Sequence, residues 1–288
     1  MSLSVVILSF HSHHLVGKIV RNIDKKIPIT IIENSRNIAL KKKLEKKYKN
    51  LRVIIPSKNL GFAPGMNLGI KKSKTNYVFC LTADITISKK CIKNIKNFIS
   101  KFSDFALLAP TYKNEKIYKN YLINEDKKII NKKLHNKFGL SEVDWIDGGG
   151  FIYNKRKMKS IGLYDEKFFI YFEQEDLIKR IKEFKKKIYV CKKIKFDHAG
   201  SKSCHPSKIN EMKLLLAWHY CWAKFYFYKK HYGYFVGIRK TIPNLLRSLK
   251  KIFLSLFKNE NEVKIDKARI NGLINSYFLR KSSFRLLE

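Results

Sequence analysis

The first half of the chain alternates short apolar runs with basic stretches of helical periodicity. Apolar runs over residues 4–10, 27–32, 52–55 and 77–82 predict buried strands. The stretches between them predict helices up to about residue 22, over 38–49 and over 65–72. Strands that alternate with helices form βαβ units, so the sequence predicts an α/β fold with a mainly parallel sheet flanked by helices.

The second half is less regular at first. Residues 101–143 are rich in Lys, Asn and Tyr and poorly periodic, which predicts a connection with irregular strands. A helix is expected from Glu173, with Leu177, Ile181 and Phe184 as its buried stripe. A short strand over 187–191 is expected before the sequence Asp197-His198.

The chain ends in a basic segment with apolar positions three or four residues apart. This spacing predicts a helical C-terminal extension over 233–288, following a first domain over 1–232. Such a helix either packs its apolar stripe on the first domain or on a second subunit of a homodimer, or lies in an anionic membrane interface. Its apolar positions are Ile242, Leu245, Leu246, Leu249, Ile252, Phe253, Leu256 and Phe257, with Arg247, Lys250, Lys251 and Lys258 around them.

The charge balance is strongly basic. The 288 residues include 61 Lys and Arg against 23 Asp and Glu, a formal net charge of +38. This excess suits a polyanionic partner, which could be nucleic acid, an anionic membrane or a phosphate-bearing substrate. Only 10 of the basic residues are arginines, however, and a reader of DNA bases is expected to use more. Compositional drift towards lysine on a solvated surface is the alternative explanation.

The cysteines and the N-terminus bear on the cellular compartment. Five cysteines at wide spacings, with no Cys-x-x-Cys pair, predict neither a disulfide framework nor a zinc ribbon, and favour a reducing cytoplasm. The first apolar run follows no basic segment and precedes no small-residue cleavage site, so we interpret it as a strand. No uncharged run approaches the ~18 residues that a membrane span needs.

Polar and glycine-rich residues follow each of the first four predicted strands. These strand ends should meet at one edge of the sheet, where ligands bind in such folds. The loop with Gly61, Pro64 and Gly65 leads into a helix whose first amides can hold an anion such as a diphosphate, although ordinary turns use the same residues. The segments concerned are Ser9-Phe10-His11, Glu33-Asn34-Ser35, the loop over 59–67, and Thr82-Ala83-Asp84.

The second half of the chain contains three further candidates for ligand-binding or catalytic residues. Three consecutive glycines at 148–150 allow either a close approach to a ligand or a plain loop. Glu173 and Asp176 share one face of a helix start, where acids favour the helix dipole, but aromatic residues precede them and could raise a carboxyl pKa towards that of a general base. His198 is either a metal or phosphate ligand or a structural histidine.

Taken in order, these motifs resemble the family 2 glycosyltransferases of the GT-A, Rossmann-like fold, most closely their rhamnosyltransferase-like branch. The resemblance spans about residues 3–232. A weaker similarity continues in Gly272-Leu273 and in Ser282-Ser283-Phe284-Arg285. The resembling segments are 5–10, Glu33-Asn34-Ser35, 59–67, 81–84, 148–150, 162–173 and 198–201.

This resemblance implies transfer of a sugar, with inversion, from a nucleotide-diphosphate donor to a saccharide or lipid-linked saccharide in cell-surface polysaccharide synthesis. A rhamnose-like sugar on dTDP is the donor it implies first, with UDP- and GDP-sugars as alternatives. It implies a cytoplasmic enzyme that could attach peripherally to the inner face of the plasma membrane. The donor-binding residues it implies are Ser9, Glu33, Asn34, Ser35, Asn59, Gly61, Phe62, Gly65, Asn67, Asp84 and Gly149.

The resemblance also implies a divalent cation, Mg²⁺ or Mn²⁺, that neutralises the leaving diphosphate. Asp84 matches the last acid of the family's Asp-x-Asp-like motif, and His198 matches a position that can complete the metal or phosphate contacts. The motif here is Thr82-Ala83-Asp84, so metal binding depends on a single acid.

A second departure concerns the general base. The family's Glu-Asp pair is Glu173-Gln174 here, and glutamine cannot accept a proton. Among Glu173, Glu175 and Asp176, we favour Glu173 as the base and Asp176 as the residue that orients it or replaces it.

Two alternative functions are also compatible with the sequence. One is a sugar-nucleotide-binding protein that has lost catalysis, and the other is a basic nucleic-acid-binding protein, for which no arginine-rich or aromatic-platform motif is found.

Overall fold

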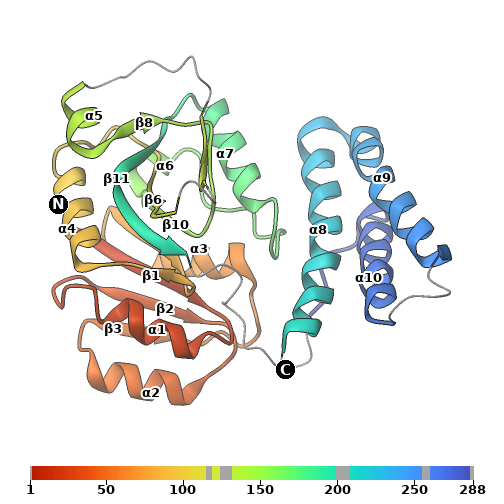
Figure 1. Cartoon of the computed structure of the whole chain (residues 1–288), viewed down its shortest axis with the longest axis horizontal. Helices are drawn as coiled ribbons and strands as arrows, with labels where there is room; N and C mark the ends of the chain where they lie inside the picture. The colour runs from red at the N-terminus through yellow and green to blue at the C-terminus, as the bar shows by residue number, and fades with distance from the viewer. Residues whose placement is uncertain (1, 115–118, 124–131, 199–207, 255–259, 286–288) are drawn as a thin grey trace. The chain divides into compact units, whose positions relative to one another are not determined.

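A computed structural model of the chain describes residues 2–114, 119–123, 132–198, 208–254 and 260–285 (Figure 1). The chain divides into two compact units. The first unit comprises Met1–Asn59, Gly65–Tyr164 and Leu177–Ser203, and the second comprises Leu60–Pro64, Asp165–Asp176 and Cys204–Glu288. These units do not correspond to the two domains expected from sequence, and a domain boundary at residue 232 stays a prediction.

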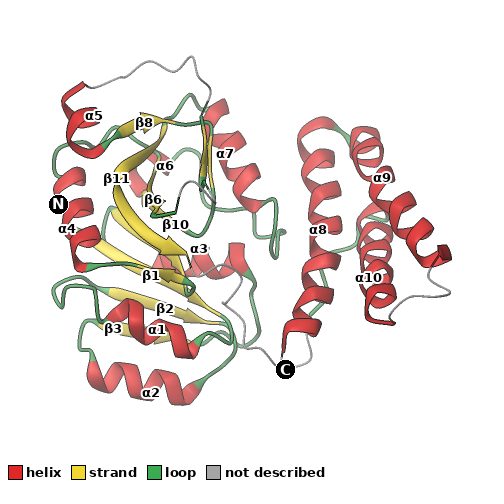
Figure 2. Ribbon diagram, in the orientation of Figure 1, coloured by secondary structure: helices red, strands yellow, loops and turns green. Residues whose placement is uncertain are grey.

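The first unit is built on a mixed, mainly parallel sheet (Figure 2). Its main path runs β3-β2-β1-β4-β10-β6-β11-β5, and β8 also pairs with β11. The contacts β1–β2, β2–β3, β1–β4 and β6–β11 are parallel and are mostly the longer ones. Strand β10 is antiparallel to both of its neighbours, and β5 and β8 are antiparallel to β11. The strands are β1 (Leu3–Ser9), β2 (Ile29–Glu33), β3 (Leu51–Ile54), β4 (Tyr77–Thr82), β5 (Ile85–Thr86), β6 (Leu107–Tyr112), β8 (Leu140–Glu142), β10 (Gly150–Asn154) and β11 (Ile188–His198). A separate two-stranded sheet pairs β7 (Tyr121–Leu122) with β9 (Trp145–Ile146).

Helices cover the sheet because alternate strand residues point to opposite faces. Val5 and Ile7 of β1 join a core cluster with apolar residues of the helices on one face. Val6 points to the other face, where the helix containing Gly69 lies so close that a Cβ at Gly69 would be 2.3 Å from a methyl of Val6. The helices of the first face are α1 (His13–Val20), α2 (Ile38–Lys47), α4 (Lys89–Ile99) and α5 (Lys132–Phe138). The helix with Gly69 is α3 (Phe62–Lys72), and α6 (Lys155–Met158) and α7 (Glu173–Glu183) come later in the chain.

Local side-chain bonds explain where several helices begin. The Asn37 side chain accepts a hydrogen bond from the Leu40 amide at the start of α2, and Ser88 does the same for Cys91 at the start of α4. In α3, Pro64 lies in the first turn, where a missing N–H costs nothing.

The second unit contains three long helices that pack on one another, α8 (Ile209–Tyr232), α9 (Tyr234–Phe253) and α10 (Glu260–Tyr277) (Figure 1). Gly233 separates α8 from α9 with a φ of 95°, which suits glycine. Gly272 of α10 lies against the backbone of α8, since a Cβ there would be 2.3 Å from the Trp218 carbonyl oxygen. Ser248 of α9 donates to Asp266 of α10 at 3.0 Å.

The α/β class, the sheet flanked by helices and the helical C-terminal region are confirmed. Phe184 was expected to be buried, but it is 48% exposed because α7 ends at Glu183, before its position. The short strand expected over 187–191 continues to His198, across an irregularity between Cys191 and Lys195. Residues 199–201 and 256–258 of the predicted motifs lie outside the described residues.

Residues 101–143 were expected to form irregular strands, yet they include the regular strand β6 and helix α5. All six residues of β6 are buried, so the strand lacks the apolar–polar alternation by which a half-buried strand is recognised.

Candidate active site

The carboxyl ends of β1 and β2 bring the first group of predicted donor-binding residues together. Ser9 pairs with Glu33 in the register, and the Asn34 amide donates to the Ser9 carbonyl at 2.8 Å. The Glu33 Oε1 accepts from both the amide and the hydroxyl of Ser35. Within the part of the chain that the structure describes, the buried Ser9 Oγ and Glu33 Oε2 have no hydrogen-bond partner. Unpaired buried polar atoms are costly, so this site suits a ligand that supplies hydrogen-bonding groups.

The helix α3 approaches these strand ends closely. A Cβ on Gly65 would lie 2.7 Å from a methyl of Leu8 and 3.3 Å from the Asn34 side-chain nitrogen, so a larger residue would push α3 away. Asn67 is buried two residues later, and its side chain bonds both the amide and the carbonyl of Tyr164. Asn67 therefore fixes the 164 segment, and Asn59 lies half-buried in the same unit.

The end of β4 carries a second polar group. The Asp84 carboxylate accepts from the Thr82 hydroxyl at 2.6 Å and lies 3.3 Å from the Nε2 of His198. The His198 ring stacks on Tyr112, whose hydroxyl donates to Asp147 at 2.7 Å. Strands β4, β6 and β11 and the turn before β10 therefore converge at one place.

Gly149 packs closely against the group formed by Asp84, His198, Tyr112 and Asp147. The Gly149 amide donates to Asp147 at 3.1 Å, and its carbonyl accepts from the Thr82 amide at 2.9 Å. A Cβ on Gly149 would lie 3.0 Å from the Tyr112 hydroxyl, so glycine suits this close packing. The Ala83 amide also donates to the Leu8 carbonyl, which places the Asp84 group at the same sheet edge as Ser9.

The electrostatics of this group favour a charged pair. Burial raises the pKa of Asp84, but hydrogen bonds from His198 and Thr82 and the attraction of His198 outweigh it, so the pKa falls below its ordinary value. The hydrogen bond to Asp84 raises the pKa of His198. Burial raises the pKa of Asp147, although Tyr112 and Gly149 donate to its carboxyl group.

The same residues bear on the expected cation. No group of three or more His, Cys, Asp or Glu side chains that could hold a metal occurs among the described residues. Asp84 and His198 nevertheless bring one carboxylate and one imidazole together, a donor set that suits Mn²⁺ or Mg²⁺ when phosphate oxygens and water complete the coordination. The residues present therefore fit a cation that is held jointly with a diphosphate.

The predicted base lies in the second unit, at the first turn of α7. Glu173 is 7% exposed, its Oε2 has no partner among the described residues, and burial raises its pKa to about 8. Tyr171 and Phe172 precede it with φ values of 72° and 63°. Consecutive non-glycine residues in this region are strained, and such strain clusters at functional sites.

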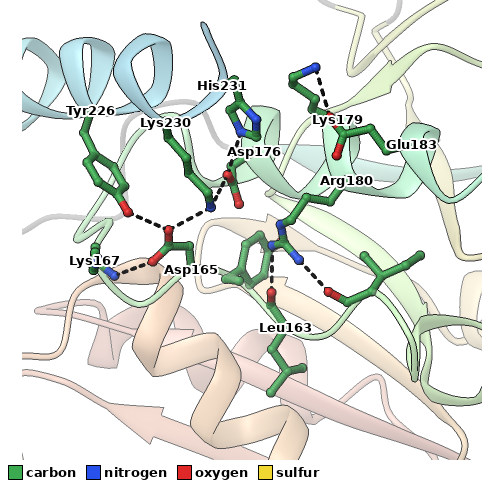
Figure 3. A network of polar contacts seen from close by, with 12 residues as sticks. Leu163, Asp165, Lys167, Asp176, Lys179, Arg180, Glu183, Tyr226, Lys230 and His231 are labelled. Carbon is green, nitrogen blue, oxygen red and sulfur yellow. Dashed lines mark hydrogen bonds and ion pairs between the residues drawn. The ribbon is translucent and has the colours of Figure 1, made fainter. Parts of the chain in front are cut away.

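Asp176 has different surroundings, drawn in Figure 3. It is fully buried, and its Oδ1 lies 2.5 Å from the Lys230 Nζ and 2.9 Å from the His231 Nε2 of α8. Lys230 also reaches Asp165 at 2.8 Å, and the Tyr226 hydroxyl donates to Asp165 at 2.9 Å. Lys230 thus ties both ends of the segment Asp165–Asp176 to one turn of α8.

The predicted residues Gly61 and Phe62 also belong to the second unit. Gly61 has a φ of 80°, and a Cβ there would lie 2.4 Å from the Phe169 ring and from its carbonyl oxygen. The Phe62 amide donates to that carbonyl at 2.6 Å. Only glycine fits this turn, because both the backbone angle and the space exclude a side chain.

Several residues that contact the predicted site residues were not predicted from the sequence. Asp147 sits immediately before the three glycines, and a polar residue next to a glycine run was the available signal. Tyr112, Tyr226, Lys230 and His231 carried no signal, since ordinary aromatic and basic residues surround them in the sequence.

Comparisons with known proteins bear on the family and the fold of this chain. A sequence model described as glycosyl transferase family 2 matches residues 5–162, more than half of the chain. No curated protein matches the sequence.

The fold is similar to solved glycosyltransferase structures at low sequence identity. A mannosyltransferase from Pyrobaculum calidifontis in complex with GDP-Man and Mn²⁺ superposes with a TM-score of 0.57 at 9% identity, over 97% of this chain and 88% of that one. TarS residues 1–349 of S. aureus with UDP give 0.51 at 13% identity, over 100% and 95%. GalNAc-T7 with UDP, GalNAc and Mn²⁺ gives 0.55 at 15% identity, over 94% and 54%.

Proposed function

Because the chain belongs to glycosyl transferase family 2, we propose that it is an inverting glycosyltransferase that uses a nucleotide-diphosphate sugar. The observation that supports this most directly is the pair of buried, unpartnered oxygens on Ser9 and Glu33 among the described residues. A nucleoside offers hydroxyl and N–H groups that bond to such acceptors. The proposed donor-binding set also includes residues that contact this pair or fix the segments next to it, which are Asn34, Ser35, Gly65 and Asn67. We add Asn59, Gly61 and Phe62 to this set.

We assign the diphosphate end to the group at the end of β4. Asp84 and His198 would hold a Mg²⁺ or Mn²⁺ ion there, and Gly149 would allow close approach. When bound, the cation neutralises charge on the leaving diphosphate. Asp147 keeps Tyr112, and through it the His198 ring, in place.

Glu173 is the proposed general base. The acceptor hydroxyl oxygen forms a bond to the anomeric carbon while the bond from that carbon to the diphosphate oxygen breaks. The electron pair leaves with the nucleoside diphosphate, and Glu173 takes the hydroxyl proton. Its raised pKa strengthens it as a base. Asp176 would orient the segment, because Lys230 and His231 already bind its carboxylate.

The test is release of nucleoside diphosphate from a panel of dTDP-, UDP- and GDP-sugars with Mn²⁺ or Mg²⁺ and saccharide or lipid-linked acceptors. We expect turnover with one donor, with dTDP-rhamnose tried first. Glu173→Gln should lower kcat at least ~100-fold, the usual contribution of a general base. Asp84→Ala should lower turnover at least ~10-fold through weakened charge neutralisation.

The matched control is Glu183→Gln, at the exposed end of the same helix, which should keep full turnover. Glu175→Gln tests the remaining acid of the first turn. Donor binding without turnover across all acceptors would instead support a protein that has lost catalysis, for which Gln174 is the reason. Tight DNA binding with no nucleotide binding would contradict both.

We also propose that the protein attaches peripherally to the inner face of the plasma membrane and acts there on a lipid-linked acceptor. No helix in the described part of the chain is long and apolar enough to cross a membrane. Helix α9 instead exposes large apolar residues, with Phe235 at 86% and Phe253 at 80%. At 100° per residue, these fall within about 60° of arc together with Ile242, Leu246 and Leu249.

Basic residues border this apolar face of α9 along one side, and its buried residues Gly237, Thr241 and Ser248 lie on the opposite side of the helix. Arg239 and Lys250 border the face, which suits anionic headgroups. Co-sedimentation with anionic vesicles is the measurement that tests this attachment.

A further inference from the structure

The last described residues of the chain are fixed along α8 in the second unit. The Trp222 Nε1 donates to the Arg280 carbonyl at 3.0 Å, and Trp218 stacks on Phe284 with ring centres 5.9 Å apart. His219 lies between these two tryptophans in the sequence and contacts both the Phe284 carbonyl and the Ser282 hydroxyl. All three α8 residues are buried, so residues 280–285 are held at several points.

The protonation of His219 suits this arrangement. Burial lowers its pKa to about 3, so the ring is neutral at physiological pH. A neutral imidazole has one N–H and one lone pair. The Nε2, 2.9 Å from the Phe284 carbonyl, can donate, and the Nδ1 can accept from Ser282 at 3.0 Å. The ring therefore satisfies both partners and holds the segment in one position.

This anchoring places Arg285 on Phe169. The guanidinium carbon lies 3.9 Å from the centre of the Phe169 ring, which also stacks with His219. The same ring packs on Gly61, and the Phe169 carbonyl binds the Phe62 amide. Arg285 is therefore built into the aromatic contact at the Gly61-Phe62 turn, on the segment that also carries Glu173.

No acid neutralises this guanidinium in the described residues. Its hydrogen bond there runs from Nη1 to the Phe284 carbonyl at 2.7 Å, which leaves most of its five donors for other partners. Arg285 is exposed as a whole residue, but stacking on Phe169 covers one face of its guanidinium, and burial of that part lowers the pKa of Arg285. Such a cation gains from an anion that restores the lost hydrogen bonds.

We propose that Arg285 is a substrate-binding residue whose guanidinium binds a phosphate group of the substrate. This rests on the proposed function, in which both the donor and a lipid-linked acceptor contain phosphate. The planar fork of arginine matches phosphate oxygens two at a time, and stacking on Phe169 keeps the fork in a fixed orientation.

The experiment compares wild type with Arg285→Gln and Arg285→Lys. The affinity for dTDP, UDP and GDP is measured by calorimetry, and KM is measured for a polyprenyl-phosphate-linked acceptor. We expect Arg285→Gln to weaken one of these at least ~10-fold, the effect of a lost hydrogen bond between charged groups. Arg285→Lys should recover part of the loss. A fall in nucleotide affinity assigns the donor phosphate, and a raised acceptor KM alone assigns the acceptor phosphate.

Arg280→Gln is the matched control, because this arginine is exposed like Arg285, lies on the same segment and contacts Phe278. It should change neither measurement. Circular dichroism of each variant checks that the fold is intact. If Arg285→Gln binds both phosphate ligands as wild type does, the inference is wrong while the proposed function stands. If wild type binds no phosphate ligand, both are wrong.

Discussion

At the residue scale, Glu173 and Asp176 differ in what surrounds them, although one turn of α7 separates them. Asp176 is fully buried but bound by Lys230 and His231, so its carboxylate charge is compensated. Glu173 is buried without a charged partner in the contacts described, and burial raises its pKa to about 8. A carboxyl group of that kind can accept a proton near neutral pH, whereas a paired one serves to hold structure.

The pH dependence of turnover should show this difference. The base must be deprotonated to act, so kcat/KM for the acceptor should rise with pH and level off above about 8, where Glu173 is ionised. Glu173→Gln should remove that rising limb together with most of the activity. An inflection near the ordinary Glu value of about 4.3 would show instead that the base is a solvated carboxyl group.

The positions of Ser9, Glu33 and Asp84 could be predicted from the sequence. Each of these residues lies at the end of a strand recognisable from its apolar run, and parallel strands end at the same edge of the sheet. Contacts such as Tyr112–Asp147 or Asp176–Lys230 could not be predicted, because they depend on how distant elements pack. No local pattern in the sequence indicates which lysine of 51 lies beside a given acid.

At the element scale, two helical glycines have opposite surroundings. Gly272 of α10 meets the α8 backbone, which cannot move aside as a side chain can, while a Cβ on Gly17 of α1 would meet nothing within 4 Å. The helices α8 and α10 can pack this closely only because residue 272 has no side chain. The sequence does not distinguish the two glycines, since both lie inside helical patterns.

We therefore expect alanine to act in opposite directions at these positions. Gly272→Ala should lower the free energy of unfolding by about 1–3 kcal/mol through overpacking. Gly17→Ala should raise it by up to about 1 kcal/mol, because alanine favours the helix. Urea unfolding of both variants measures this, and equal effects of the two substitutions would contradict the close packing of α8 and α10.

At the scale of the whole molecule, the proposed membrane attachment has two separable contributions, and the net charge of +38 supplies only the first. Lysine spread over the surface attracts any polyanion and is screened by salt. The exposed apolar face of α9 adds a contribution that salt does not screen, because it depends on removing apolar surface from water.

The pair Leu246→Asp/Phe253→Asp tests that contribution. It should weaken co-sedimentation with anionic vesicles at least ~10-fold, since burying one Leu or Phe is worth about 1.5–3 kcal/mol. Ile38→Asp, at an apolar residue of α2 that is 60% exposed, is the control and should bind as wild type does. Binding that salt abolishes and that the double variant retains would assign attachment to the lysine charge alone.

The shared lysine of the Asp165–Asp176 segment has a consequence for engineering. Lys230 binds the acid at each end of that segment, and Tyr226 and His231 bind one end each. A chimaera that transplanted residues 165–176 alone would bring in two buried or half-buried acids and leave their counterions behind. The exchangeable cassette is therefore discontinuous, and it includes residues 226–231 of α8.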